Sequence, residues 1–277
     1  MNKIILPLLL SISAFAEVPE NISEFPVQIE IGGSMGSGFF VMTSNRVFLV
    51  TAKHVLFDIA STNRSLPLRG STLSFSAWSK AVYGTATYNI QHYYTNNEVR
   101  FSNDRDVAVV HFCDLVGTNK ILGFELDYVT VNPNTNWFQG MPYEQLRKIR
   151  DLSVAEDAYT FGYPVSIGSA LPGKRQLDST RPLARKGIIS DVDLRRNVIV
   201  IDMPVYFGNS GGPVLTVQKV RNVFPDSYHA AVVGIVSQFI PFEDVWVSQR
   251  YNLPNVSWSN SGYAVVEPID SVIALLW

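Results

Sequence analysis

The stretch Phe207-Gly-Asn-Ser-Gly-Gly-Pro213 holds a single serine, Ser210, with glycines on both sides. Glycine adopts positive φ without strain, so this stretch can turn tightly and present the serine hydroxyl in an open position. The N–H groups of Gly208 and Ser210 could then converge on one point and stabilise a developing oxyanion. The pattern predicts a nucleophile site, although the same residue pattern also occurs in ordinary glycine-rich turns.

Two upstream residues can supply the partners that such a serine needs. A hydroxyl is a weak nucleophile until a base takes its proton, and imidazole is a base near neutral pH. His54 follows the apolar run 47–51, and Asp106 leads into Val-Ala-Val-Val. A carboxylate beside the imidazole fixes its tautomer and stabilises the imidazolium that forms. We expect Asp106, at the mouth of a buried strand, to take this role, and Asp104 to be solvated.

The elements that must position these residues are predicted to be strands. Short runs rich in Val, Ile, Phe and Tyr alternate with Gly, Pro, Asn and Ser, which is typical of an all-β sandwich or barrel. Such runs include 27–31, 38–43, 47–51, 72–78, 107–112, 158–161, 187–189, 198–201, 231–237 and 263–266. Gly36-Ser-Gly38 lacks the Lys-Ser/Thr of a phosphate-binding loop and is interpreted as a turn that leads into a strand beside 47–51. At the end of the chain, Asp270 is expected to cap a short helix over 271–277.

In the order His, Asp, Ser, these residues resemble the triad of the chymotrypsin-like serine peptidases. The α/β-hydrolases use the order Ser, Asp, His, and the subtilisins use Asp, His, Ser. The closest resemblance is to the bacterial, disulfide-poor Deg/HtrA-type branch, and it extends over most of the chain. The matching segments are 36–41, 51–55, 106–109, 158–164, 186–190, 202–214, 233–237 and 262–265.

The resemblance implies a fold of two six-stranded antiparallel β-barrels with a short C-terminal helix. It also implies that Ser210 is the nucleophile, that His54 is the base and that Asp106 orients the imidazole. Gly208 and Ser210 would form the oxyanion hole. Neither a cofactor nor a metal is implied.

The resemblance gives a weaker indication of specificity. The substrate would pair as an added β-strand near Ser237, Gln238 and Phe239, and the floor of the primary pocket would fall near Pro204 and Val205. This floor carries no Asp, so selection for Lys or Arg is not expected. The bulky Phe239 would narrow the pocket and favour small or aliphatic side chains. A slip of one or two residues in this part of the match stays open.

Asn209 departs from the animal trypsins, which usually carry Asp at this position. That Asp pairs with an N-terminal ammonium released by zymogen cleavage. Asn offers no charge, so activation by insertion of a new N-terminus is not expected.

The start of the chain is typical of a secretory signal peptide. Lys3 precedes the apolar run 4–12, and Ala14-Phe-Ala16 fits a cleavage site. The run is too short to span a bilayer, and a buried N-terminal strand is the alternative. We therefore expect export to a periplasm or to the medium.

The expected organisation of the chain is a signal peptide at 1–16 followed by two barrels. The N-terminal barrel would cover 17–125 and the C-terminal barrel 156–277. They would be joined by a connection at 126–155, within which 143–150 could form a short helix. No segment follows the terminal helix that could form a PDZ domain.

The composition narrows the choice of partners to a protein or peptide substrate. The net charge is −2, which does not indicate a nucleic-acid or anionic-membrane partner. The single cysteine, Cys113, allows no intrachain disulfide, and it lacks the neighbouring ligands of a metal site. We interpret it as a packing residue. The oligomeric state cannot be read from these patterns.

The leading interpretation is an exported serine endopeptidase. A catalytically silent binding or chaperone module on the same fold is an alternative, and a serine esterase is another.

Overall fold

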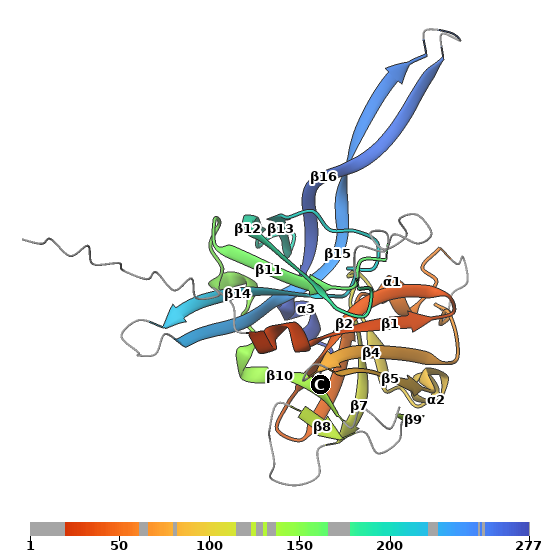
Figure 1. The fold of residues 1–277 in the computed structure, drawn as a ribbon, viewed down its shortest axis with the longest axis vertical. Coiled ribbons are helices and arrows are strands. Elements are labelled where there is room, and N and C mark those ends of the chain that lie inside the picture. The colour runs from red at the N-terminus through yellow and green to blue at the C-terminus, as the bar shows by residue number, and fades with distance from the viewer. Residues whose placement is uncertain are drawn as a thin grey trace, which may run out of the picture.

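The computed structural model describes residues 20–60, 66–79, 82–114, 123–125, 130–131, 137–165, 178–220, 227–248, 250 and 253–276. The predicted signal segment 1–16 lies outside these residues. The chain consists mainly of strands, which form two β-sheets (Figure 1). The structure thus confirms the all-β fold with a short C-terminal helix, and the second of its two sheets is a six-stranded barrel as expected.

The first sheet contains ten strands from the N-terminal half of the chain, and most of its neighbours are antiparallel. Eight of these strands lie in the order β6-β7-β3-β2-β1-β4-β5-β9, and β10 joins β2 to β8. The strands are β1 (Pro26–Ile31), β2 (Ser34–Met42), β3 (Arg46–Thr51), β4 (Leu73–Ser79), β5 (Val82–Tyr88), β6 (Val99–Phe101), β7 (Ala108–Asp114), β8 (Gly123–Glu125), β9 (Thr130–Val131) and β10 (Trp137–Pro142).

The segment expected to be only a connection, 126–155, contributes β9 and β10 to this sheet. β10 lies parallel to β2, with Gly140 beside Phe40 in the register. A Cβ atom at Gly140 would approach the Cγ atom of Met42 to 2.6 Å, so the glycine permits this close pairing. Met141 is buried in the core.

The second sheet is a closed barrel of six strands in the order β11-β12-β13-β16-β15-β14, and every neighbouring pair is antiparallel. Its strands are β11 (Asp157–Gly162), β12 (Leu183–Asp193), β13 (Val198–Asp202), β14 (Pro213–Val220), β15 (Ser227–Val247) and β16 (Pro254–Pro268). Figure 1 shows that β15 and β16 leave the barrel together as a long ribbon.

The described helices are short. They are α1 (Lys53–Leu56), α2 (Ile90–Thr95) and α3 (Ile269–Ile273), with 3-10 turns η1 (Glu20–Glu24), η2 (Tyr143–Gln145) and η3 (Ile149–Asp151). The possible helix at 143–150 is therefore two separate turns. Between them, Leu146 forms a β-bridge with Val232, which interrupts the helical path.

Asp270 does not cap the terminal helix, contrary to the expectation from the sequence. α3 begins at Ile269, two residues before the expected start, and Pro268 occupies the N-cap position. The Asp270 carboxylate instead accepts a hydrogen bond from the Ile149 N–H at 2.8 Å. The side chain thus ties the terminal helix to the segment that connects the two sheets.

One hydrophobic core joins the two sheets. It contains Phe39 and Val50 from the first sheet together with Leu215 and Ile235 from the barrel and Ile269 from α3. A smaller core fills the barrel itself. Because both sheets bury side chains in the same cluster, residues at their boundary are held at defined positions.

Candidate active site

The register of β3 and β7 explains why His54 and Asp106 meet. These strands are antiparallel neighbours, and Thr51 lies opposite Ala108. The end of one strand and the start of the other therefore share an edge of the sheet. His54 follows this edge on α1, and Asp106 precedes it, so 52 residues of chain separate two side chains that are adjacent in space.

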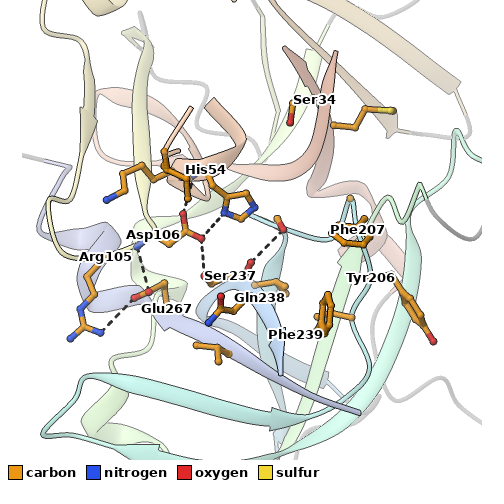
Figure 2. A pocket seen from close by; sticks show the side chains of 18 of the residues that line it. Ser34, His54, Arg105, Asp106, Tyr206, Phe207, Ser237, Gln238, Phe239 and Glu267 are labelled. Atoms are coloured by element: carbon orange, nitrogen blue, oxygen red, sulfur yellow. Dashed lines mark hydrogen bonds and ion pairs between the residues drawn. The ribbon is translucent and has the colours of Figure 1, made fainter. Parts of the chain in front are cut away.

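The Asp106 carboxylate holds the His54 imidazole in one orientation (Figure 2). The Oδ2 atom lies 2.7 Å from Nδ1 of the ring, and Oδ1 accepts a hydrogen bond from the His54 backbone N–H at 3.0 Å. Burial raises the pKa of Asp106, but the hydrogen bonds and charge of His54 outweigh it and hold the pKa below its usual value. An ionised carboxylate can only accept, so Nδ1 carries the proton and Nε2 is left as an acceptor.

A second layer of polar groups surrounds Asp106. The Ser237 hydroxyl donates to Oδ2 at 2.7 Å, and Oε1 of Glu267 accepts from the Asp106 backbone N–H at 3.4 Å. Arg105 lies 3.9 Å from the other Glu267 oxygen. Asp104 is exposed and lines an open cleft that also contains His54. Within the described part of the chain, however, it makes no hydrogen bond or ion pair with His54.

Ser210 lies on the loop between β13 and β14, whose path requires two glycines. Gly208 has φ +96°, and a Cβ atom there would come within 2.2 Å of the Tyr163 carbonyl oxygen. Gly211 has φ +83°, and its Cβ would come within 2.2 Å of the Ser37 carbonyl oxygen. The Gly208 and Ser210 N–H groups have no acceptor among the described residues, whereas the Asn209 N–H donates to the Tyr206 carbonyl.

The loop is anchored by Ser37 of β2, a residue that the sequence analysis missed. The buried Ser37 hydroxyl donates to the Gly208 carbonyl at 2.6 Å and accepts from the Tyr163 N–H at 3.0 Å. Its backbone N–H donates to the Ser210 carbonyl at 2.8 Å. Gly36-Ser-Gly38 is part of the strand itself, whereas the sequence predicts a turn before the strand. The two glycines leave room for Val55 and for the β3 backbone.

The Ser210 hydroxyl points toward the Ser237 carbonyl, at an Oγ···O distance of 3.4 Å. This distance is long for a bond from a hydroxyl. No hydrogen bond joins the hydroxyl to His54 within the described residues. Both side chains line one open cleft of about 770 Å³ at the boundary of the two sheets.

The residues expected to contact substrate are only partly brought together. Val205, Ser237, Gln238 and Phe239 line the cleft. Pro204 does not, because the chain turns the Val205 side chain inward and leaves Pro204 exposed. Of the two residues expected near the pocket floor, the cleft therefore contains Val205.

Two aromatic rings, those of Phe207 and Phe239, line the cleft near each other (Figure 2). Phe239 packs edge-to-face against the exposed Phe207, with 6.0 Å between the ring centroids. This contact narrows the space in which a substrate side chain would lie.

Asn209 lies on the same loop as Ser210, and its side chain is buried. Neither its amide nitrogen nor its amide oxygen finds a hydrogen-bond partner among the described residues. The side chain carries no charge, so the loop is held by the Ser37 hydrogen bonds and by packing rather than by an ion pair.

Within the described ranges, no three or more His, Cys, Asp or Glu side chains are grouped so that they could hold a metal ion. In the same residues, no helix has the length and apolar character needed to cross a membrane. Cys113 is partly buried and packs against the larger core.

Comparison with known proteins gives one family match. Residues 36–221 match the trypsin-like peptidase domain. No curated protein matches the chain. Three of the similar solved structures are Deg5, the HtrA-type protease AlgW with a tripeptide, and the thermostable serine protease AL20 from an extremophilic microorganism.

The sequence identities to these three structures are low. Deg5 is 16% identical, with a TM-score of 0.48 over 91% of this chain and 87% of its own. AlgW is 14% identical, with a TM-score of 0.47 over 91% of this chain and 58% of its own. AL20 is 13% identical, with a TM-score of 0.47 over 91% of this chain and 95% of its own.

Proposed function

Because this chain belongs to the family of trypsin-like peptidase domains, we propose that it is a serine endopeptidase that hydrolyses peptide bonds through an acyl-enzyme intermediate. The single observation that carries the proposal is the pairing of His54 with Asp106 in the cleft that also contains Ser210. The N–H groups of Gly208 and Ser210, which have no acceptor among the described residues, support it because they can stabilise a developing negative charge.

The proposed reaction begins when the Ser210 hydroxyl rotates toward His54. The oxygen attacks the carbonyl carbon of the substrate while Nε2 of His54 takes the hydroxyl proton. The carbonyl oxygen becomes an oxyanion and is held by the N–H groups of Gly208 and Ser210. When the peptide C–N bond breaks, the imidazolium gives its proton to the leaving amine.

In the second half of the reaction, a water molecule takes the place of the Ser210 hydroxyl as the attacking group and releases the acyl group. Nε2 takes a proton from water, the hydroxide attacks the acyl carbon, and the proton returns to the Ser210 oxygen as the ester bond breaks. Throughout, Asp106 keeps the Nδ1 proton in place and stabilises the imidazolium. Neither a metal nor a cofactor takes part in the proposed steps.

We further propose that the protein is exported by the segment 1–16 and acts in a periplasm or outside the cell on proteins or peptides. The packing of Phe239 against Phe207 supports a preference for small or aliphatic side chains next to the scissile bond. The floor residue Val205 offers no charge to a Lys or Arg side chain.

The experiment that tests the proposal compares the protein starting at Glu17 with its Ser210→Ala variant. We expect a fluorophosphonate probe to label the first and not the second. Casein cleavage should fall by about 10⁶-fold, since loss of a triad nucleophile removes nearly all turnover. Ser34→Ala, which removes another serine of the same cleft, should still be labelled.

The same measurements separate the alternatives. Undiminished casein cleavage by the purified Ser210→Ala protein rules out Ser210 as the nucleophile. Absence of labelling in the folded unmodified protein favours a silent binding module. Turnover of a small activated ester without casein cleavage favours an esterase.

A further inference from the structure

The two longest strands of the barrel extend beyond it and form a two-stranded ribbon (Figure 1). We call this ribbon the arm and define it as residues 241–247 of β15 and 254–260 of β16. The arm is paired in continuous register, from Pro241 opposite Asn260 to Val247 opposite Pro254. A two-stranded ribbon alone is at best marginally stable in water, because it buries little apolar surface.

The arm carries large apolar side chains on both faces. Directly opposite residues in an antiparallel pair share a face. One face therefore holds Val245 opposite Val256, beside Trp258, and the other holds Phe242 and Trp246. Each of these five side chains is at least half exposed. A cluster of exposed apolar residues of this kind marks a binding surface rather than ordinary surface variation.

The arm is continuous with the candidate active site. β15 passes Ser237, whose carbonyl oxygen lies near the Ser210 hydroxyl, and then Gln238 and Phe239 in the cleft before it enters the arm. β14 pairs with β15 only as far as Ile235. From Ser237 onward, no described strand occupies the side of β15 that faces away from β16.

This free edge of β15 is long enough to bind a substantial length of extended chain. Residues 237–247 rise by about 3.3 Å each, so the edge runs for roughly 35 Å from the nucleophile. Free N–H and C=O groups along such an edge can pair with an added strand. Pro241 supplies no N–H group, so an added strand would pair on both sides of this residue rather than at it.

The charge of the arm indicates what the added strand must carry. Glu243 and Asp244 are consecutive on β15, so their side chains point to opposite faces. The two strands of the arm contain no Lys or Arg, and Arg250 lies in the turn that joins them. Neither carboxylate has an ion-pair partner among the described residues. An added strand would therefore match the arm best with apolar side chains and basic residues near these two positions.

We propose that the arm extends the substrate cleft, and that an extended apolar polypeptide segment with basic residues binds along the free edge of β15 as a further β-strand. This inference rests on the proposed peptidase function. It assigns the enzyme a substrate class, namely unfolded or extended segments that reach well beyond the scissile bond. The contact would raise the affinity for long substrates without changing the reacting groups.

The observations favour this occupant over two others. A second copy paired edge to edge by a two-fold axis centred on the arm would bring Glu243 and Asp244 of both copies together, and like charges directly opposite are destabilising. An anionic lipid surface would repel the same carboxylates. A substrate segment avoids both kinds of charge repulsion. Its scissile bond would lie in the cleft, at the near end of this edge.

The test uses the full mature protein and synthetic peptides whose sequence surrounds one of the sites at which this protein cleaves casein. A short peptide keeps about three residues on each side of the scissile bond. Two longer peptides add about ten Val- and Thr-rich residues on one side or the other, which matches the edge at roughly 3.3 Å per residue. Each longer peptide is made with two lysines or with two glutamates. The readout is kcat/KM for each longer peptide divided by that for the short one.

We expect one lysine-bearing extension to raise kcat/KM by at least about tenfold, equivalent to about 1.4 kcal/mol. Val245→Thr with Trp246→Thr should abolish most of this gain while keeping strand propensity. Glu243→Lys with Asp244→Lys should invert the preference in favour of the glutamate peptide, an outcome that misfolding cannot produce. The matched controls, Val154→Thr with Leu194→Thr for exposed apolar residues and Glu30→Lys for charge, should retain the gain.

Several outcomes would overturn the inference. One is a ratio near one for both extensions, and another is a gain that the arm variants leave intact. A dimer that dissociates on the Val245 and Trp246 substitutions, or cosedimentation with phosphatidylserine vesicles, would assign the arm to a different occupant. If the short peptide and the fluorophosphonate probe both fail to react, the peptidase proposal fails. Fluorescence anisotropy of a labelled long peptide then tests the arm separately.

Discussion

At the scale of single residues, the candidate site contains two carboxyl groups that lie close together and whose pKa values are shifted in opposite directions. Asp106 is hydrogen-bonded by His54 and Ser237, which favours its ionised form. Burial raises the pKa of Glu267, and the neighbouring Asp106 charge adds to this effect. The first carboxyl can therefore stabilise an imidazolium, while the second accepts a hydrogen bond from the Asp106 backbone N–H.

We expect Asp106→Asn to lower kcat/KM for a casein-derived peptide by about 10⁴-fold near neutral pH. The amide would present an N–H group to the imidazole and favour the tautomer protonated at Nε2, which cannot accept the Ser210 proton. Asp104→Asn is the control and should have little effect, because Asp104 does not contact His54. The assignment is wrong if the two variants exchange these effects.

Glu267→Gln should change how stability depends on pH. Because the pKa of Glu267 is raised in the folded protein, the unfolded chain releases this proton at a lower pH. Stability contributed by the neutral carboxyl is therefore present at low pH and lost as the pH rises from the unfolded pKa through the folded one. Glutamine has nothing to ionise, so it escapes this loss.

We therefore expect the Tm of Glu267→Gln, relative to the unmodified protein, to increase between about pH 4 and pH 7, in the range where a glutamate titrates. Thermal unfolding in a series of buffers measures this difference. A Tm difference that stays constant or decreases over the range would contradict the expected ionisation of Glu267 in the folded state. The glutamine oxygen can still accept from the Asp106 N–H, so the local hydrogen bond is retained.

At the scale of elements, the loop between β13 and β14 is shaped by backbone positions that only glycine fills easily. Gly208 and Gly211 combine positive φ with close backbone neighbours, and Ser37 fastens the loop from the other sheet. The orientation of the Gly208 and Ser210 N–H groups therefore depends on the path of the whole loop. A change in its path would affect the stabilisation of an oxyanion before it affected the imidazole.

Gly208→Ala should abolish most probe labelling, because the new methyl group would meet the Tyr163 carbonyl oxygen and displace the Gly208 N–H. Gly33→Ala is a matched control, since Gly33 also has positive φ but its new methyl group would meet no atom within 4 Å beyond the adjoining residues. Both variants should lose about 1–2 kcal/mol of unfolding free energy from the left-handed backbone alone. Only Gly208→Ala should lose reactivity, and equal labelling rates in the two proteins would contradict this account.

The elements also show how far the sequence could be interpreted. The β-class, the strands before His54 and after Asp106, and the glycines around Ser210 could be predicted, because each depends on local patterns. Ser37 and Glu267 could not, since their importance comes from contacts with residues 171 and 161 positions away. The Gly-Ser-Gly pattern at Ser37 was visible but has no unique local meaning.

The length of β15 and β16 was likewise not predictable from local patterns. The sequence favours strands at 231–237 and 263–266, whereas the strands extend to Val247 and begin at Pro254. Pro241, the adjacent acidic residues and the many Asn and Ser residues resemble a loop. Pairing across the ribbon, which one strand alone cannot indicate, keeps this segment extended.

At the scale of the whole molecule, the two sheets act as one unit around the cleft. Arg105 follows the first sheet's strand β6 and donates to the carbonyls of Arg196 and Asn197 in the turn between β12 and β13. Glu267 in β16 accepts a hydrogen bond from the Asp106 N–H, and Ser37 in β2 donates one to the loop that carries Ser210. The relative position of the two sheets therefore determines how these groups of the candidate site are arranged.

We expect the only cleavage needed for activity to be the one after Ala16. Asn209 offers no charge to an N-terminal ammonium released by cleavage. The loop that carries Ser210 must therefore be ordered by the neutral contacts already present. A protein with additional residues before Glu17 should react with a fluorophosphonate probe about as fast as one that starts at Glu17. A silent extended protein that becomes reactive after trimming would show that an N-terminal switch operates despite Asn209.

The arm also gives the protein a built-in optical signal. Of the five tryptophans in the chain, Trp246 and Trp258 lie on the arm with at least half of each side chain in water. Indole emission shifts to shorter wavelength when water leaves the ring, so a segment bound along the arm would shift the emission of the folded protein to the blue. Global unfolding instead brings more water to the indole rings, which shifts the emission to the red. Occupancy of the arm and loss of the fold would therefore change the emission spectrum in different ways, without an attached label.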